Sequence, residues 1–180
     1  PETVVFHLAP TNSGKTYESL VALAANRSGV SAAPLPQLAH EPYARLSPQL
    51  PPGSVGLSTG EEEIDPDAPI VCCTVEKAPV RGDLLVLDES HWVADPDRGH
   101  HWARLALTGD YREMHLISAA EAYLLLKPLV ADAKKITVVN HKRLSRLDVL
   151  TAPIRPDGVR ERTLVVAFSR KGLYAVAAAL

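Results

Sequence analysis

Short apolar runs alternate with longer stretches of helical spacing along most of the chain. The apolar runs predict strands at residues 3–8, 30–33, 55–58, 70–74, 84–87, 114–118 and 136–140. The stretches between them predict helices at residues 15–26, 39–46, 101–107 and 119–127. Strands that are apolar at every position are typical of a parallel sheet buried on both faces. The pattern therefore predicts an α/β domain with a mostly parallel sheet and helices on both faces.

Two segments break this pattern with clustered prolines. They cover residues 34–54 and 151–163, where we expect loops, and the second of them is predicted to be a linker. Beyond the linker, residues 164–168 predict a strand and residues 171–180 a helix that ends in an alanine-rich run without a cap. We therefore expect one complete domain at 1–150, a linker at 151–163 and the start of a second, truncated domain at 164–180.

Composition and charge exclude several classes of protein. Of the 180 residues, 46% are hydrophobic and 22% are charged, which excludes a disordered or fibrous chain. No apolar run approaches the length of about 18 residues that a membrane span requires, and the first residues do not resemble a secretory signal. The net charge of -2 argues against a strongly basic protein that wraps nucleic acid, although a local basic groove remains compatible with it.

The cysteine positions indicate the redox compartment. Cys72 and Cys73 are adjacent within a predicted strand, so their side chains point to opposite faces and are poorly placed to pair. This arrangement fits a reducing cytosol. A composition rich in arginine, alanine and leucine is associated with GC-rich bacterial genomes, so we expect a cytoplasmic bacterial protein.

A candidate phosphate-binding loop, Ala-Pro-Thr-Asn-Ser-Gly-Lys-Thr at residues 9–16, follows the first predicted strand and opens the first helix. Its Ala9 stands where the usual pattern begins with glycine. Backbone N–H groups of such a loop surround phosphate oxygens at a helix N-terminus, Lys15 reaches the β- and γ-phosphates, and the Thr16 hydroxyl binds Mg²⁺. The alternative is a chance Gly-Lys-Thr at a strand–helix turn. The predicted nucleotide-binding residues are Pro10, Thr11, Asn12, Ser13, Gly14, Lys15 and Thr16.

A second motif places two carboxylates at the end of a buried strand. The run at 84–87 is followed by Asp88 and Glu89, and ligands of open α/β sheets bind at such carboxyl ends. We predict that Asp88 holds Mg²⁺, partly through water, and that Glu89 polarises the water that attacks the γ-phosphate. Taken alone, the pair could equally cap a helix N-terminus. Next to a phosphate-binding loop, the catalytic interpretation is favoured, with Lys15, Asp88 and Glu89 as catalytic residues.

Together these motifs resemble motifs I and II of superfamily-two helicases with a DExH box, and finer matches resemble the mitochondrial-degradosome RNA helicase, or Suv-three, family. The matching segments lie at residues 10–17, 33–35, 38–41, 59–62, 73–76, 95–96, 98–99, 142–144, 166–169 and 174–176. They follow the order of the family and cover nearly the whole chain. The resemblance implies a RecA-like phosphate-loop domain at 1–150 and the opening of a second RecA-like domain at 164–180.

The resemblance also implies roles for individual residues. Loops predicted to contact the RNA backbone contain Pro34, Leu35, Thr59, Gly60, Thr74, Val75 and Glu76. Ser118 occupies the motif that couples hydrolysis to domain movement, and His91 the position that senses the γ-phosphate and the other domain. Two residues depart from the family pattern: Pro36 replaces a frequent basic residue, and His91 replaces the usual glutamine. Most of the second domain, including its arginine finger, is not in the chain.

Other residues have simpler interpretations. Residues 59–63 could form a solvated turn, and Trp92 and Trp102 are expected to pack behind the second motif. His91, His100 and His101 lack a cysteine pair or a His-x₃-His spacing, so zinc binding is not expected. The basic residues of the C-terminal third predict a solvated face or the rim of an RNA channel, namely Lys134, Lys135, Lys142, Arg143 and Arg146.

The sequence thus predicts the core of an ATP-dependent RNA helicase, nearly inactive as a fragment, with ATP and Mg²⁺ as ligands. Expected partners are single-stranded or partly duplex RNA, with DNA as an alternative, and an exoribonuclease; no membrane is expected. A eukaryotic member of this family would function in the mitochondrial matrix. Two other functions stay open at this point: a nucleotide-gated RNA-binding scaffold without turnover, and a nucleoside-kinase-like phosphate-loop enzyme, although the zinc-binding cysteine pairs of thymidine kinases are absent from the sequence.

Overall fold

The protein was analysed as a computed structural model that describes residues 1–10 and 13–179. Contacts divide the chain into two units, Pro1–Ser145 and Arg146–Leu180. The division falls close to the expected end of the first domain at residue 150, and the identity of the second unit stays a prediction.

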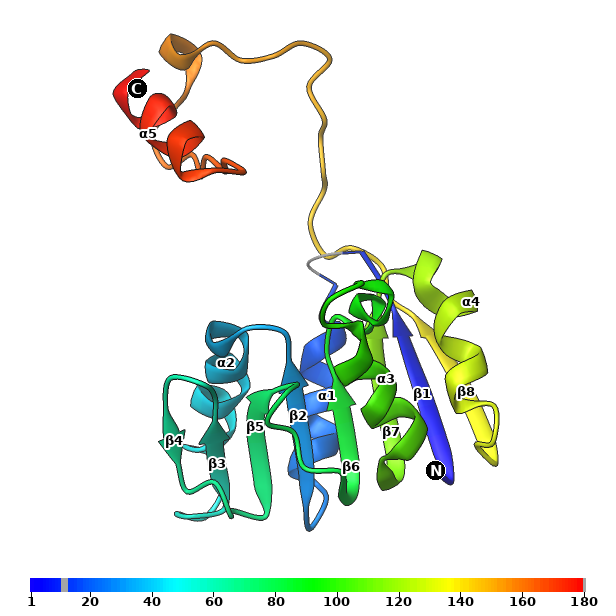
Figure 1. Ribbon diagram of the computed structural model, residues 1–180. Helices are drawn as coiled ribbons and strands as arrows, with labels where there is room; N and C mark the ends of the chain where they lie inside the picture. Colours follow the sequence, from blue (N-terminus) through cyan, green and yellow to red (C-terminus); the bar gives the residue numbers. More distant parts are fainter. Residues whose placement is uncertain (11–12, 180) are drawn as a thin grey trace. The chain divides into compact units, whose positions relative to one another are not determined.

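Within the described residues of the first unit, eight strands form one sheet in the order β4-β3-β5-β2-β6-β7-β1-β8 (Figure 1). All neighbouring strands are parallel except β3 and β4, which are antiparallel. The predicted mostly parallel sheet is therefore confirmed. The strands are β1 (Thr3–Leu8), β2 (Gly29–Ala33), β3 (Val55–Ser58), β4 (Glu63–Ile64), β5 (Ile70–Thr74), β6 (Arg81–Leu87), β7 (Asp110–Ser118) and β8 (Lys135–Asn140).

Helices cover both faces of this sheet. The α-helices are α1 (Lys15–Ala24), α2 (Pro36–Leu46), α3 (Gly99–Thr108), α4 (Tyr123–Leu126) and, in the second unit, α5 (Arg170–Ala179). Shorter 3₁₀ turns lie at Ser90–Ala94, Ala120–Ala122, Lys127–Val130 and Pro156–Gly158. None of these described helices is both long and apolar enough to cross a bilayer.

Two apolar cores sandwich the sheet. Leu20 and Leu23 of α1 pack with Leu84 and Val86 on one face, whereas Trp102 of α3 packs with residues of the other face. Successive strand residues alternate between the cores, so Cys72 belongs to the first and Cys73 to the second. Both thiols are free and buried, and burial raises the pKa of each, which excludes them as nucleophiles.

The proline-rich segment 34–54 is less irregular than its composition predicted. Pro36 begins α2 at the first helical position, where a missing N–H costs nothing, and Pro42 lies buried inside the helix. A leucine, Leu35, provides the N-cap, without a side-chain hydrogen bond. The helix begins three residues earlier than predicted because prolines at a helix start are permitted rather than disruptive.

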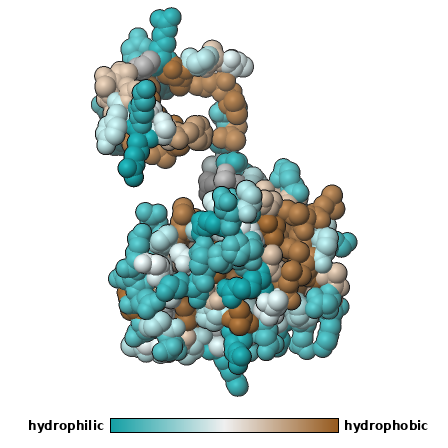
Figure 2. All heavy atoms as spheres, in the orientation of Figure 1, coloured by the Kyte–Doolittle hydropathy of each residue, from teal (hydrophilic) through white to brown (hydrophobic). Residues whose placement is uncertain are grey.

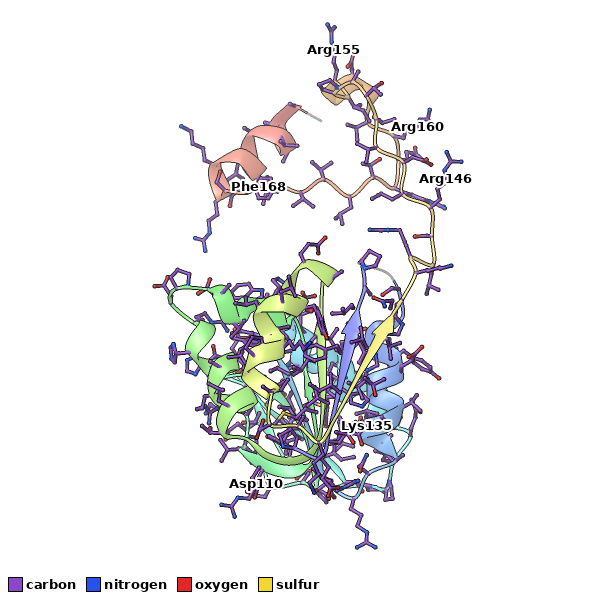
Figure 3. All side chains as sticks on the ribbon, turned by 90° about the vertical axis from the view of Figure 1, so that its right-hand side faces the viewer. Asp110, Lys135, Arg146, Arg155, Arg160 and Phe168 are labelled. Carbon is purple, nitrogen blue, oxygen red and sulfur yellow. The ribbon has the colours of Figure 1, made fainter. Side chains whose placement is uncertain are left out.

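Two other predictions need correction. Residues 119–127 do not form a single helix: a 3₁₀ turn, the four-residue α4 and a second 3₁₀ turn follow one another, because Pro128 cannot donate a backbone hydrogen bond. Residues 164–168 do not form a strand either, since a strand needs a neighbour for its backbone hydrogen bonds, and Phe168 is fully exposed. Figure 3 shows the Phe168 side chain close to the start of α5.

The surface of the first unit is mainly hydrophilic on the face seen in Figure 2. An apolar area lies over α4, where Leu124 and Leu125 are exposed by 79% and 47%.

Candidate nucleotide and nucleic-acid site

The predicted motifs converge at the carboxyl end of the sheet, because they follow parallel strands that end close together. β7 pairs Ser118 with Leu8 of β1 and Leu116 with Leu87 of β6. The phosphate-binding loop after β1 and the carboxylates after β6 therefore lie on either side of β7 at one end of the sheet (Figure 1).

The described part of the phosphate-binding loop has the backbone geometry that the motif requires. Gly14 is the N-cap of α1 and adopts a left-handed conformation with φ of 78°, which side chains other than glycine rarely allow. Its carbonyl accepts hydrogen bonds from the N–H groups of Tyr17 and Glu18. Thr16 is half-buried in the first turn. Thr11 and Asn12 lie outside the described residues.

Ser13 shows an unsatisfied polar atom inside this loop. Its side chain is buried, and its Oγ atom has no hydrogen-bond partner among the described residues. A buried hydroxyl without a partner costs about 1–3 kcal/mol, so its presence calls for an acceptor. A phosphate oxygen in the loop would be such an acceptor. The loop therefore fits a nucleotide phosphate.

Asp88 and Glu89 are held in place by main-chain and side-chain contacts. The Asp88 N–H donates to the carbonyl of Ala32, and the Asp88 carbonyl accepts from Nε1 of Trp102 at 3.1 Å. Glu89 has a φ of 45°, and its N–H donates to Oδ1 of Asp88 at 2.9 Å. A positive φ in a non-glycine residue is uncommon and concentrates at functional sites.

His91 and Ser118, the two predicted coupling residues, both lie at this edge. Nδ1 of His91 is 3.2 Å from Oε2 of Glu89, so the imidazole directly contacts the carboxylate that the sequence assigned to water activation. Ser118 is buried at the end of β7, and its carbonyl accepts from the N–H of Ala9 at the start of the phosphate-binding loop. His91 thus contacts the second motif, and Ser118 contacts the phosphate-binding loop.

A groove of about 320 Å³ lies beside the carboxylates and collects most of the predicted RNA-contacting residues. It is lined by Pro34, Leu35, Pro36, Gly60, Thr74, Glu76, Lys77 and Arg98. Val75 does not line it: its side chain is fully buried, and its N–H donates to the carbonyl of Ala33. Thr59 is also buried and organises the turn through its hydroxyl, which accepts from the N–H groups of Glu61 and Glu62.

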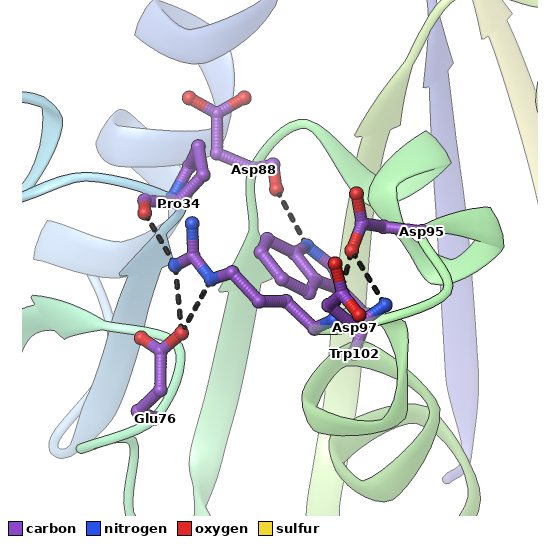
Figure 4. A network of polar contacts seen from close by, with 7 residues as sticks. Pro34, Glu76, Asp88, Asp95, Asp97 and Trp102 are labelled. Atoms are coloured by element: carbon purple, nitrogen blue, oxygen red, sulfur yellow. Dashed lines mark hydrogen bonds and ion pairs between the residues drawn. The ribbon is translucent and has the colours of Figure 1, made fainter.

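Arg98 is the central residue of this groove, and the sequence assigned it no role. Figure 4 shows the network of polar contacts that includes Pro34, Glu76 and Trp102. Nε and Nη2 donate to Oε1 of Glu76 at 2.9 and 2.6 Å, and Nη2 also donates to the carbonyl of Pro34 at 2.7 Å. Partial burial alone would raise the pKa of Glu76, but the hydrogen bonds and charge of Arg98 outweigh it and lower this pKa.

The two tryptophans pack as predicted. Their stacked rings have centroids 5.7 Å apart, and Trp102 is almost completely buried. The basic residues of the predicted RNA-channel rim do not gather in one place: Lys142 and Arg143 follow the carboxyl end of β8, which lies in register with that of β1. Lys135 begins β8 and, like Asp110 at the start of β7, lies at the amino ends of the strands (Figure 3), while Lys134 pairs with Glu2 there.

A larger hollow than this groove also lies at the amino ends of the strands. It has a volume of about 1200 Å³ and is lined by residues such as Glu2, Gly29, Arg81 and Asp110. The phosphate-binding loop and the carboxylates do not line it. Size therefore does not identify the site in this fold, whereas the carboxyl ends of the strands do.

A buried chain of three histidines crosses the face of the sheet beneath the phosphate-binding loop. Nδ1 and Nε2 of His7 lie 3.0 Å from Nε2 of His141 and 3.1 Å from Nδ1 of His115, and Nε2 of His115 lies 2.9 Å from Oε1 of Glu113. A neutral imidazole carries one N–H. If Glu113 is ionised, it accepts from His115, which accepts from His7, which accepts from His141.

Sequence reasoning missed this chain because its members are 108 and 134 residues apart along the sequence. Burial, followed by the charges of His115 and His141, lowers the pKa of His7 to about 4. In the described residues, His7, Glu18 and His141 are the group whose ligand atoms lie close enough, within 4.8 Å, to share a metal ion.

The comparisons with known proteins agree with this geometry. The family model of the DEXQ-box helicase domain of Suv3 matches residues 1–142. The chain is 37% identical to the mitochondrial ATP-dependent RNA helicase SUV3 of Saccharomyces paradoxus over 179 residues, covering 93% of the chain and 24% of that protein. It is 33% identical to the human mitochondrial ATP-dependent RNA helicase SUPV3L1, covering 96% of the chain and 23% of that protein. The chain thus spans about a quarter of the length of these relatives.

A solved structure supports the RecA-like helicase fold. The helicase domain of Hef from Pyrococcus furiosus superposes with a TM-score of 0.58 at 17% sequence identity, covering 77% of the chain and 35% of that structure. The predicted α/β fold of the RecA-like type is therefore confirmed.

The unsatisfied Ser13 hydroxyl yields a test in which two effects oppose each other. Ser13→Ala removes a buried polar atom that has no partner among the described residues. The free energy of unfolding of the nucleotide-free protein should therefore stay the same or rise by up to about 3 kcal/mol. The same change should weaken Mg·ATP binding several-fold. Urea unfolding and calorimetric titration measure the two effects. Loss of stability with unchanged affinity would contradict the assignment.

The histidine chain yields a pH prediction. The folded pKa of His7, about 4, lies below its ordinary value of 6.5, so the unfolded state binds more protons between these values and stability falls as the pH falls. Between pH 7 and pH 5 this should remove about 2 kcal/mol of unfolding free energy. His7→Gln should show a correspondingly smaller pH dependence in urea unfolding. An identical dependence in both proteins would exclude His7 as the cause.

Proposed function

We propose, from the premise that the chain belongs to the Suv3 family of DEXQ-box helicases, that it forms the first RecA-like domain of an ATP-dependent RNA helicase. The observation that supports this most directly is the Ser13 hydroxyl, buried without a partner among the described residues in a phosphate-binding loop one strand away from Asp88 and Glu89. The relatives are named ATP-dependent RNA helicases, and the activity of the whole protein is part of this proposal.

The catalytic step is attack of water on the γ-phosphate of ATP. The loop amides, the Ser13 hydroxyl and Lys15 stabilise the phosphate charge, and Thr16 and Asp88 would hold Mg²⁺. Bound Mg²⁺ would supply Lewis-acid neutralisation of the phosphate oxygens. Glu89 orients and polarises the water. His91, 3.2 Å from this carboxylate, limits the orientations of Glu89. It stands at the position of the glutamine in the DEXQ box for which the family is named.

The groove beside the box is the site for a single RNA strand. Pro34, Gly60 and Thr74 offer small or polar groups to a sugar–phosphate backbone. Single-stranded RNA, or the single-stranded end of a partial duplex, is therefore the proposed substrate, and DNA would fit the same backbone contacts. An exoribonuclease is the proposed partner, which would degrade the strand that the helicase releases.

Unwinding requires a second RecA-like domain that closes on nucleotide and RNA. We assign residues 164–180 to the start of that domain, with the segment 151–163 as the linker, and α5 as its first helix. In a bacterium the protein would act in the cytoplasm, whereas the relatives named above are mitochondrial.

A substitution at Glu89 distinguishes an enzyme that hydrolyses ATP from a scaffold that binds RNA under control of a nucleotide. In the full-length protein, Glu89→Gln should bind ATP normally and lose turnover by about two orders of magnitude or more, because the amide cannot polarise water as a carboxylate does. Asp88→Asn should also weaken Mg²⁺-dependent binding. Phosphate release and nucleotide titration measure both variants. Normal turnover of Glu89→Gln would favour a scaffold without catalytic use of this carboxylate.

RNA binding should depend little on salt. The cations of the groove, Arg98 and Lys77, are paired with Glu76 and Glu63, so few phosphates are neutralised. Each neutralised phosphate of a single strand contributes about -0.7 to the slope of log affinity against log salt. For residues 1–180 we expect weak binding, independent of base sequence, with a slope of about -1 to -2. Fluorescence anisotropy across a salt series would reveal a missed basic surface, such as Lys142 and Arg143, as a steep slope.

A further inference from the structure

Arg98 connects two walls of the proposed RNA groove. One wall is Pro34, which directly follows β2, and the other is Glu76, two residues beyond the end of β5. The guanidinium donates to the Pro34 carbonyl and to the Glu76 carboxylate at 2.6–2.9 Å (Figure 4). Both walls line the groove, as Arg98 itself does. A strand that enters the groove therefore meets the three groups that this network joins.

The same guanidinium also contacts the segment behind the DExH box. It lies 5.3 Å from the ring centre of Trp92 and 5.6 Å from that of Trp102, which is the range of cation–π attraction. Trp102 donates from Nε1 to the carbonyl of Asp88. The backbone of Arg98 is anchored by Asp95, whose Oδ1 accepts from the N–H groups of Asp97 and Arg98. The contacts of Arg98 thus connect the groove to the DExH box.

We propose that Arg98 is a positioning residue that couples RNA in the groove to the geometry of Asp88 and Glu89, and so contributes to RNA-stimulated ATP hydrolysis. This inference rests on the proposed function. When RNA displaces Pro34 or Glu76, Arg98 moves with them, and the stacked tryptophans transmit the shift to the Asp88 carbonyl. Glu89 follows because its N–H is bonded to Asp88.

The chemistry of arginine suits this role better than that of lysine. The planar guanidinium presents N–H groups in a rigid fork and stacks on aromatic rings, whereas an ammonium is a single hydrated point on a flexible stem. Lysine at position 98 would keep the charge and lose the simultaneous contacts with Glu76, Pro34 and the rings. The Arg98–Glu76 pair is only partly buried, and such a pair alone is worth little, so the effect of Arg98→Lys should appear mainly in coupling rather than in stability.

The test compares RNA-stimulated ATP hydrolysis of the full-length protein with that of Arg98→Lys. We expect the ratio of RNA-saturated to RNA-free turnover to fall by about 5- to 150-fold, the usual range of coupling between two sites. The RNA concentration at half-stimulation should change less than about threefold, because Arg98 is paired with Glu76 and neutralises few RNA phosphates. Glu76→Gln should also lower the ratio, and the double variant should be no worse than the stronger single one, because both break one link.

Arg45→Lys is the matched control. Arg45 forms an exposed pair with Glu41 at 3.2 Å on α2, so the same substitution there removes an Arg–Glu contact outside the network and should leave the stimulation ratio unchanged. Thermal unfolding of each variant excludes a general loss of structure. If Arg98→Lys lowers the ratio only in proportion to lost stability, the positioning role is overturned.

Three further outcomes would overturn the proposal in different ways. Full stimulation of Arg98→Lys would leave the helicase function intact and remove the coupling. A large loss of RNA affinity with an unchanged ratio at saturation would show that Arg98 binds an RNA phosphate directly. Absence of RNA stimulation in the unmodified protein would refute the proposed function itself, and the coupling with it.

Discussion

The parallel pairing of β7 with β1 on one side and β6 on the other is the constraint on which the site depends. Ser118 lies in register with Leu8, and Leu116 with Leu87, so the two nucleotide motifs begin at the same end of the sheet, on either side of β7. Parallel pairing also requires that each strand be reached by a crossover, and α1 and α3 are parts of these crossovers. Apolar packing on both faces keeps the strands in this register.

Main-chain carbonyls at this edge are engaged by a few polar side chains. Trp102 donates to the carbonyl of Asp88, Arg98 to that of Pro34 and Ser90 to that of Leu87. The contacts of Trp102 and Arg98 tie strand ends to segments distant in the sequence, whereas Ser90 closes the turn that directly follows β6. The loops at this edge are therefore mechanically connected, as the proposed response to both nucleotide and RNA would require.

Two polar features of the first unit differ in how their hydrogen bonds are satisfied. The buried histidines are satisfied among themselves and by Glu113, so their cost of burial is offset within the protein. The hydroxyl of Ser13, in contrast, has no partner among the described residues. A satisfied buried network favours a fixed structure, and an unsatisfied buried donor favours a ligand.

The sequence by itself determined all strands of the described first unit except β4, the α/β class and the two nucleotide motifs, because each is written in a contiguous run of residues. The strands at 3–8, 55–58 and 70–74 coincide with β1, β3 and β5 to the residue. Local rules failed at prolines, because the effect of a proline depends on its position in a helix: Pro36 begins α2, whereas Pro128 interrupts a helix. They also failed at 164–168, because strand propensity forms no strand without a neighbour.

Only the tertiary structure decided which distant residues meet. Arg98 reaches Glu76 and Pro34 across 22 and 64 residues, and His7 reaches His141 across 134, separations for which a single sequence has no signal. It also placed Lys134 and Lys135 at the amino ends of the strands and buried Val75 beneath its loop. The physical reason is that strand order and register, set by packing of the whole sheet, determine which loop ends become neighbours.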